Sequence, residues 1–197
     1  MKVLDKSDKK ELAILAFATQ KQFAIWLSKN FQSSEGLWLR LYKKESGEKT
    51  ITYPEALDEA LCYGWIDGQL KPYDERSYLR KFTPRRAKSV WSKKNIEHVE
   101  RLIAVGKMRP SGIEKVEAAK VNGSWAIAYD SPNNITIPDD FMTELQKNEK
   151  AKSFFESLNK ANKYAIAWRL QTAKKPETRS KRMNAILIML SKGEKFH

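Results

Sequence analysis

Apolar residues recur along the chain at two spacings, and each spacing predicts a different kind of element. Between Leu37 and Tyr42 a leucine occupies every second position, which predicts a strand with one buried face. Further strands are expected at 12–17, where a helix is the alternative, and at 65–70 and 78–83, with a short one at 125–129. The return at 72–77 is predicted to be a loop. Pro84 ends its strand or places it at a sheet edge, because proline cannot donate a backbone hydrogen bond.

Capping residues mark where helices begin. Thr19 and Thr52 are each followed three residues later by Gln or Glu, which predicts helices starting at 20 and 53. The second of these is expected to end at Gly64. Ser92 and Pro110 open two more helices. Apolar residues at helical spacing then predict four C-terminal helices, near 138–145, 151–158, 162–173 and 176–190.

These elements together predict an α+β protein: a small, mostly antiparallel sheet with packed helices, followed by a C-terminal helical bundle. The segment 130–137 is rich in Asp, Asn, Ser and Pro, which is typical of a linker. We therefore expect an α+β domain at 1–129 and a helical region at 138–197. A chain of 197 residues is long enough for this arrangement.

The chain is strongly basic. Its formal net charge of +13 favours polyanionic partners, which include nucleic acid, anionic lipid headgroups, acidic proteins and phosphorylated small molecules. A basic surface without a specific partner is the alternative. No apolar stretch approaches the roughly twenty residues that a membrane-spanning helix needs. The oligomeric state does not follow from the sequence.

The residues for metal or nucleophile chemistry are scarce. There is one cysteine, Cys62, and there are two histidines, so no zinc pattern exists. No nucleophile elbow, dinucleotide fingerprint or phosphate-binding P-loop appears either. Cys62 lies in an apolar helical context and is expected to be a small buried hydrophobe. We therefore predict no metal, no cofactor and no catalytic residue.

The densest chemical signal lies between Arg80 and Lys94, where seven Lys or Arg residues occur without an acid. Arginine grips phosphate or carboxylate with paired donors, and a nearby tryptophan offers a stacking surface. We expect an anion site here, and a solvated basic loop is the alternative. Its candidate residues are Trp65, Asp67, Lys81, Arg85, Arg86, Ser89, Trp91 and Asn95, with Lys88 and Lys93 as further cations.

Asp67 shares a predicted strand face with Trp65. It can form a structural ion pair with Arg80 or Arg85, face a ligand, or act as a general acid or base, and the sequence leaves these alternatives open. A second basic cluster, near the start of the last helix, is either a solvated face or a second anion contact. Its members are Lys174, Lys175, Arg179 and Arg182.

Several fragments resemble the YdeI/OmpD-associated, or bacteriocin-protection, family. They are Trp26-Leu27, Gly36-Leu37-Trp38, Tyr53-Pro54-Glu55-Ala56, the run from Ala60 to Gly68, the run from Phe82 to Arg86, Ser89-Val90-Trp91-Ser92, Asn95 and the run from Ala173 to Arg179. The likeness covers about residues 12–192. It implies a bacterial, cytoplasmic protein linked to envelope stress and antimicrobial-peptide tolerance, and it implies no catalytic residues.

Three functional hypotheses follow. The first is a non-enzymatic binding module for an anionic ligand, either nucleic acid or a phosphorylated small molecule, with a Trp-flanked basic site. The second is an interaction protein of the envelope-stress response that recognises an acidic protein or anionic lipid. The third is an enzyme that acts on a small anionic substrate through Asp67 with Arg85 and Arg86.

Overall fold

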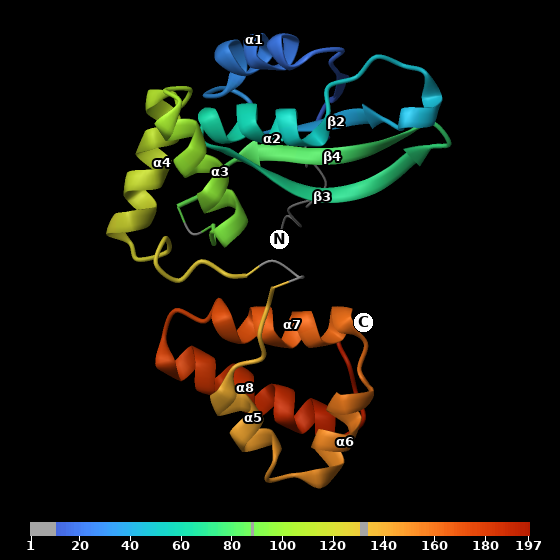
Figure 1. Ribbon diagram of the computed structural model, residues 1–197, viewed down its shortest axis with the longest axis vertical. Coiled ribbons are helices and arrows are strands. Elements are labelled where there is room, and N and C mark those ends of the chain that lie inside the picture. Colours follow the sequence, from blue (N-terminus) through green and yellow to red (C-terminus); the bar gives the residue numbers. More distant parts are fainter. Residues whose placement is uncertain (1–10, 88, 131–133) are drawn as a thin grey trace, which may run out of the picture. The chain divides into compact units, whose positions relative to one another are not determined.

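The computed structural model describes residues 11–87, 89–130 and 134–197. Lys88 and part of the predicted linker lie outside the described residues. The elements in chain order are β1 (Ile14–Ala16), α1 (Gln20–Asn30), β2 (Leu37–Tyr42), the 3-10 turn η1 (Lys44–Ser46), α2 (Tyr53–Cys62), β3 (Trp65–Asp74), β4 (Ser77–Pro84), α3 (Lys93–Ala104), α4 (Pro110–Val121), α5 (Asp139–Leu145), α6 (Glu149–Ser157), α7 (Lys160–Gln171) and α8 (Pro176–Ser191) (Figure 1).

The α+β prediction is confirmed. The strands form one mixed sheet in the order β1-β2-β4-β3, in which β1 runs parallel to β2 and the other neighbours are antiparallel. The described residues divide into two compact units. The first contains residues 11–87 and 98–118, and the second contains residues 89–97 and 119–197.

The leucines of β2 form the core of the first unit. Leu37, Leu39 and Leu41 are at most 1% exposed, because they face α1 and α2, which lie together on one side of the sheet (Figure 1). Phe23 of α1 and Phe82 of β4 join them, with ring centroids 5.8 Å apart. The alternating residues of β2 therefore face away from these helices.

The hairpin of β3 and β4 corrects one prediction. The predicted loop at 72–77 is wrong, because β3 continues to Asp74 and leaves only Glu75 and Arg76 in the turn. Pro72 is tolerated because β3 is an edge strand, and the register shifts between Asp67 and Leu70 and again between Pro72 and Asp74.

A second prediction, the strand at 125–129, is also wrong. Most of that segment is turn, and Tyr129 forms only an isolated parallel bridge with Ser92. The bridge places the entry to α3 beside Tyr129, since Tyr129 N–H donates to the Trp91 carbonyl and Lys93 N–H donates to the Tyr129 carbonyl.

The four predicted C-terminal helices are confirmed as α5 to α8, and they surround a core of their own. Its buried members are Phe141, Leu145, Ala151, Phe155, Leu158, Ile166, Leu170, Ile186 and Leu190. Asn148 and Asn159 cap α6 and α7 by accepting hydrogen bonds from backbone N–H groups inside each helix.

Candidate functional site

The first unit contains a basic pocket where β4 ends. It encloses about 440 Å³ and is lined by Leu12, Glu35, Lys81, Thr83, Pro84, Arg85 and Arg86. Pro84 is the last residue of β4, and Arg85 N–H donates to the Gly64 carbonyl at 2.9 Å, which fixes the path of the chain as it leaves the sheet. Arg85 is only 5% exposed, whereas Arg86 is exposed.

The charges of this pocket are unequal. Among the described residues that line it, three cationic side chains meet one carboxylate, that of Glu35, and this balance favours an anion at neutral pH. The buried position of Arg85 strengthens this effect, because Coulomb interactions weaken less in a poorly solvated environment. Three of the predicted site residues, Lys81, Arg85 and Arg86, are thus brought together in one pocket.

Asp67 belongs to a different group. The Tyr53 hydroxyl donates to Asp67 Oδ2 at 2.9 Å, and Arg80 Nη2 lies 3.5 Å from the same oxygen. The Arg80 guanidinium also lies 4.6 Å from the centroid of the Tyr53 ring and donates to the Gly68 carbonyl. Of the two partners expected for Asp67, the structure selects Arg80. Asp67 does not line the basic pocket.

The electrostatics of Tyr53 reflect this group. Burial, the negative charge of Asp67 and the hydrogen bond to Asp67 together raise the pKa of Tyr53 to about 12, although the positive charge of Arg80 acts in the opposite direction. Sequence reasoning missed Tyr53. The available signal was its position directly after the Thr52 cap, as the first residue of α2. The Arg80 Nε is enclosed and has no hydrogen-bond partner in the described part of the chain.

Trp65 is a core residue. It is 1% exposed, its indole donates to the Phe31 carbonyl at 3.1 Å, and its ring meets Trp26 edge-on at 5.7 Å. No open face of the indole remains to cover a ligand.

The other predicted site residues lie in the second unit. Trp91 is 3% exposed and packs on Trp125, with ring centroids 4.9 Å apart. Ser92 Oγ accepts from Asn95 N–H and so caps α3, as the sequence predicts. Ser89 also belongs to this unit, whereas the basic pocket belongs to the first.

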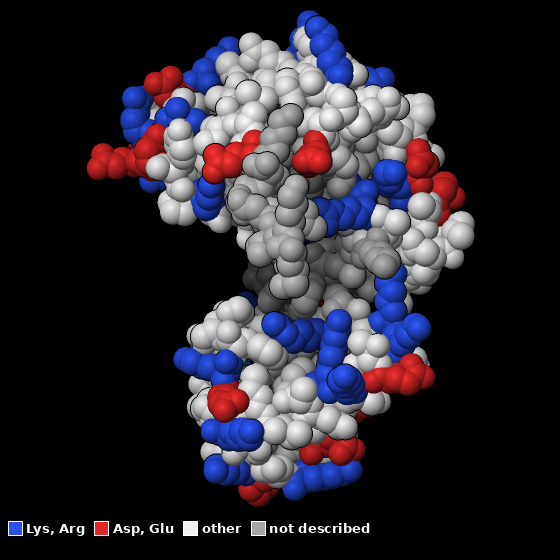
Figure 2. All heavy atoms as spheres, turned by 180° about the vertical axis from the view of Figure 1, so that it is seen from behind, with Lys and Arg blue, Asp and Glu red and all other residues white. Residues whose placement is uncertain are grey.

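The second basic cluster divides into structural and exposed members. Arg179 donates through Nη2 to both Asp140 carboxylate oxygens and through Nη1 to the Leu170 carbonyl. Arg182 donates to the Arg169 carbonyl at 2.7 Å. These two arginines join helices of the bundle. The exposed members are Lys174 and Lys175. In the view of Figure 2, Lys and Arg side chains are spread over the C-terminal helical part, with Asp and Glu side chains between them.

Arg182 also lines a pocket that sequence reasoning missed. The pocket encloses about 410 Å³, is mostly apolar, and includes Trp168, Ile186 and Phe196. The Arg169 guanidinium lies 3.8 Å from the centroid of the Phe196 ring. Phe196 is distant from Trp168 in the sequence, so only the packing of the C-terminal segment reveals this pocket.

Cys62 and the potential metal ligands were the remaining candidates for reactive chemistry. Burial raises the pKa of Cys62 to about 12, so its thiol stays protonated at neutral pH. Within residues 11–87, 89–130 and 134–197, no group of three or more potential metal ligands is found. In the same ranges no helix is both long enough and apolar enough to span a bilayer.

Two family models match different parts of the chain. Residues 15–115 match a family described as "Domain of unknown function (DUF8412)", and residues 134–193 match "Bacteriocin-protection, YdeI or OmpD-Associated". The second match confirms the resemblance to the YdeI/OmpD-associated family over residues 134–193, whereas the fragments between Trp26 and Asn95 lie in the region of the first match. Apart from Leu12, the residues that line the basic pocket lie in the region of the first match. The chain has no significant match among curated proteins or among solved structures.

Proposed function

The chain belongs to the family of the domain of unknown function DUF8412, and from the pocket in that region we propose that the protein is a non-enzymatic binding module for an anionic ligand. The observation that carries the proposal is the pocket at the end of β4, in which Lys81, Arg85 and Arg86 face one carboxylate. Its volume of about 440 Å³ is in the range of small-molecule sites, which suits a phosphorylated small molecule or part of a nucleic acid strand.

Each cation has a distinct part in this proposal. The exposed Arg86 offers its guanidinium fork to a phosphate, and Lys81 adds a more mobile ammonium group from β4. The buried Arg85 contributes a fixed positive charge. Asp67 acts indirectly, because it does not line the pocket and instead holds Arg80, which lies on the opposite face of β4 from Lys81.

The position of Asp67 gives the enzyme hypothesis little support. A general acid or base must come within hydrogen-bond reach of the group that reacts. Asp67 is committed to Tyr53 and Arg80, and its side chain is 17% exposed. We therefore assign the arginines to binding.

The proposed test compares single-charge variants in the binding of inorganic pyrophosphate, measured by titration calorimetry. Arg86→Ala and Lys81→Ala should each weaken binding by about tenfold or more, as expected for the loss of one charge-assisted contact. Lys44→Ala removes an equal charge from an exposed site outside the pocket and should bind like the wild type. Equal affinity in all four proteins, or binding by none of them, would refute the pocket as the anion site.

The proposal includes a cellular role. We propose that binding serves antimicrobial-peptide tolerance in the bacterial cytoplasm, supported by the match of residues 134–193 to the bacteriocin-protection family. A deletion strain should become more sensitive to a cationic peptide, and the wild-type gene should restore tolerance where Arg86→Ala does not. Cell fractionation checks the location.

A further inference from the structure

The sheet face that points away from α1 and α2 carries aromatic rings next to cations. Strand register assigns residues to this face, because directly paired residues share one side of a sheet. Trp38 pairs with Lys81, and Arg40 pairs with Leu79, which in turn pairs with Lys71 of β3. The rings and cations of this face, here called the aromatic face, are Trp38, Arg40, Tyr42, Lys71, Tyr73 and Lys81.

The first group on the aromatic face is centred on Trp38. Lys71 Nζ lies 4.3 Å and Lys81 Nζ 5.9 Å from the centroid of the Trp38 ring. Lys71 is exposed and its side chain is flexible, so its ammonium group can move from the ring to a phosphate. Such a movement would uncover the part of the Trp38 ring that Lys71 now covers.

The second group is more rigid. The Arg40 guanidinium lies 4.5 Å from the centroid of the Tyr42 ring and 5.0 Å from that of Tyr73. Arg40 Nη2 donates to Asp74 at 2.6 Å, and Arg40 Nε donates to Ser77 Oγ at 2.9 Å.

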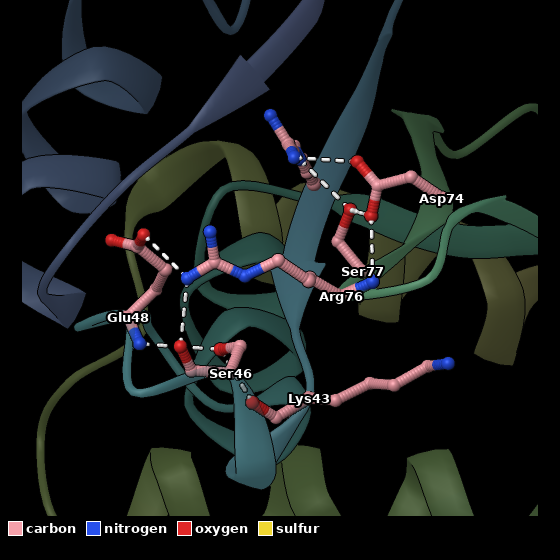
Figure 3. Close-up of polar contacts among 7 residues, drawn as sticks. Lys43, Ser46, Glu48, Asp74, Arg76 and Ser77 are labelled. Atoms are coloured by element: carbon pink, nitrogen blue, oxygen red, sulfur yellow. Dashed lines mark hydrogen bonds and ion pairs between the residues drawn. The ribbon is translucent and has the colours of Figure 1, made fainter.

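The hairpin turn supports this second group. Figure 3 shows Asp74 accepting from Arg76 N–H and from the Ser77 hydroxyl, while the Arg76 side chain reaches Ser46 and Glu48. The contacts fix Arg40 before any ligand binds. Tyr73 is 48% exposed and so keeps one accessible ring face.

Lys81 links the aromatic face to the basic pocket, because it belongs to both. The rings of Trp38 and Tyr42 are four residues apart on β2, or roughly 13 Å at the usual strand rise of about 3.3 Å per residue. The cations therefore continue from the pocket along the face, with rings between them. A chain of phosphates that carries flat, unpaired bases matches this arrangement in charge and in shape.

We propose that the aromatic face binds single-stranded nucleic acid, with bases stacked on Trp38 and Tyr73 and with the phosphates held by Lys71, Lys81 and the basic pocket. The proposal deepens the proposed function and rests on it. A double helix hides its bases from such stacking, so the face selects single strands.

The test measures binding of a short fluorescent oligodeoxythymidylate by anisotropy at several salt concentrations. Trp38→Ala and Tyr73→Ala should each weaken binding by roughly 5- to 150-fold, the range for loss of one stacked base. Trp38→Phe should recover part of the loss, because it keeps a ring. Ile25→Ala removes a 47% exposed apolar side chain from α1, on the covered side of the sheet, and should bind like the wild type.

A second probe separates phosphate binding from stacking. An abasic oligonucleotide of the same length keeps the phosphates but has no bases, so it should bind more weakly than the intact strand and should not respond to Trp38→Ala. A duplex should also bind more weakly than the single strand.

The outcomes distinguish the two proposals. If Arg86→Ala weakens oligonucleotide binding but Trp38→Ala and Tyr73→Ala do not, the pocket holds phosphate and the stacking proposal is wrong. If none of the three substitutions changes the affinity, the aromatic face and the basic pocket are both refuted. Equal affinity for the intact and abasic strands also overturns the stacking proposal.

Discussion

Gly112 lies where the first turn of α4 meets the end of α2, and its replacement by Ala gives the sharpest test of this packing. A Cβ atom at position 112 would overlap the Cys62 carbonyl oxygen, and it would lie 2.9 Å from the Cys62 carbonyl carbon and 2.8 Å from Met108 Cε. Ordinary contacts of a Cβ atom begin near 3.4 Å. The Cys62 carbonyl is also held in place, because it accepts a hydrogen bond from Arg109 N–H at 3.1 Å.

Two effects lower the free energy of unfolding of Gly112→Ala, and one raises it. Moving backbone to relieve an overpacked contact costs about 1–3 kcal/mol. Weakening the hydrogen bond from Arg109 to Cys62 adds about 1 kcal/mol. Ala favours a helix over Gly by about 1 kcal/mol. We therefore expect Gly112→Ala to lower the free energy of unfolding by roughly 1–3 kcal/mol, whereas the helix propensity alone would raise it.

The assay is urea unfolding followed by tryptophan fluorescence, with far-UV circular dichroism to confirm that the variant folds. Ala118→Gly is the matched control, because Ala118 is an exposed residue of the same helix and its substitution measures the local propensity. That control should lose about 1 kcal/mol. An increase in stability for Gly112→Ala would show that α4 does not contact the end of α2 as described.

Three further predictions concern the core and two titratable groups. Phe141→Ala should destabilise the C-terminal helices by about 3–5 kcal/mol, because the ring is 0% exposed, and thermal unfolding checks this loss. Tyr53 should ionise near pH 12, as seen in the difference in phenolate absorbance between the wild type and Tyr53→Phe. Because the folded pKa is raised, the stability that Tyr53 contributes is present below pH 10 and is lost as the pH rises towards 12. Ionisation near pH 10 would contradict the burial of Tyr53 and its contact with Asp67. Burial acts to raise the pKa of Asp58, but hydrogen bonds from Arg101 and His98 outweigh it, so the pKa is lowered. The stability that Asp58 contributes should therefore be lost as the pH falls through its folded pKa. Asp58→Asn should show a smaller loss of stability in acid.

Local patterns predicted the elements well where one physical signal dominated. The alternating leucines of β2 predicted its burial, and Thr52 with Glu55 forms the capping box that its spacing indicates. The end of β3 was missed because a proline within an apolar-poor stretch is typical of a loop. Proline is tolerated in an edge strand, and the edge position of β3 depends on the strand order of the whole sheet rather than on Pro72 itself.

The candidate site was likewise predicted only in part. Sequence spacing grouped Arg85 with Arg86, and the structure places both beside Lys81. It did not predict that Trp65 is fully enclosed, because burial of a ring depends on partners such as Trp26 that are distant in the sequence. The aromatic face was missed for a related reason, since Tyr73 fell in the predicted loop.

Helix α3 belongs to both compact units, because its first residues group with the second unit and the rest, from His98 onward, with the first. A ribosome releases Trp91 before Trp125 has been synthesised, so the indole that becomes 3% exposed in the finished molecule is uncovered in the growing chain. The second unit is therefore completed late, from segments released at different times. A fragment trimmed to residues 15–115 would contain Trp91 but not Trp125, and it would be prone to aggregate through that apolar surface.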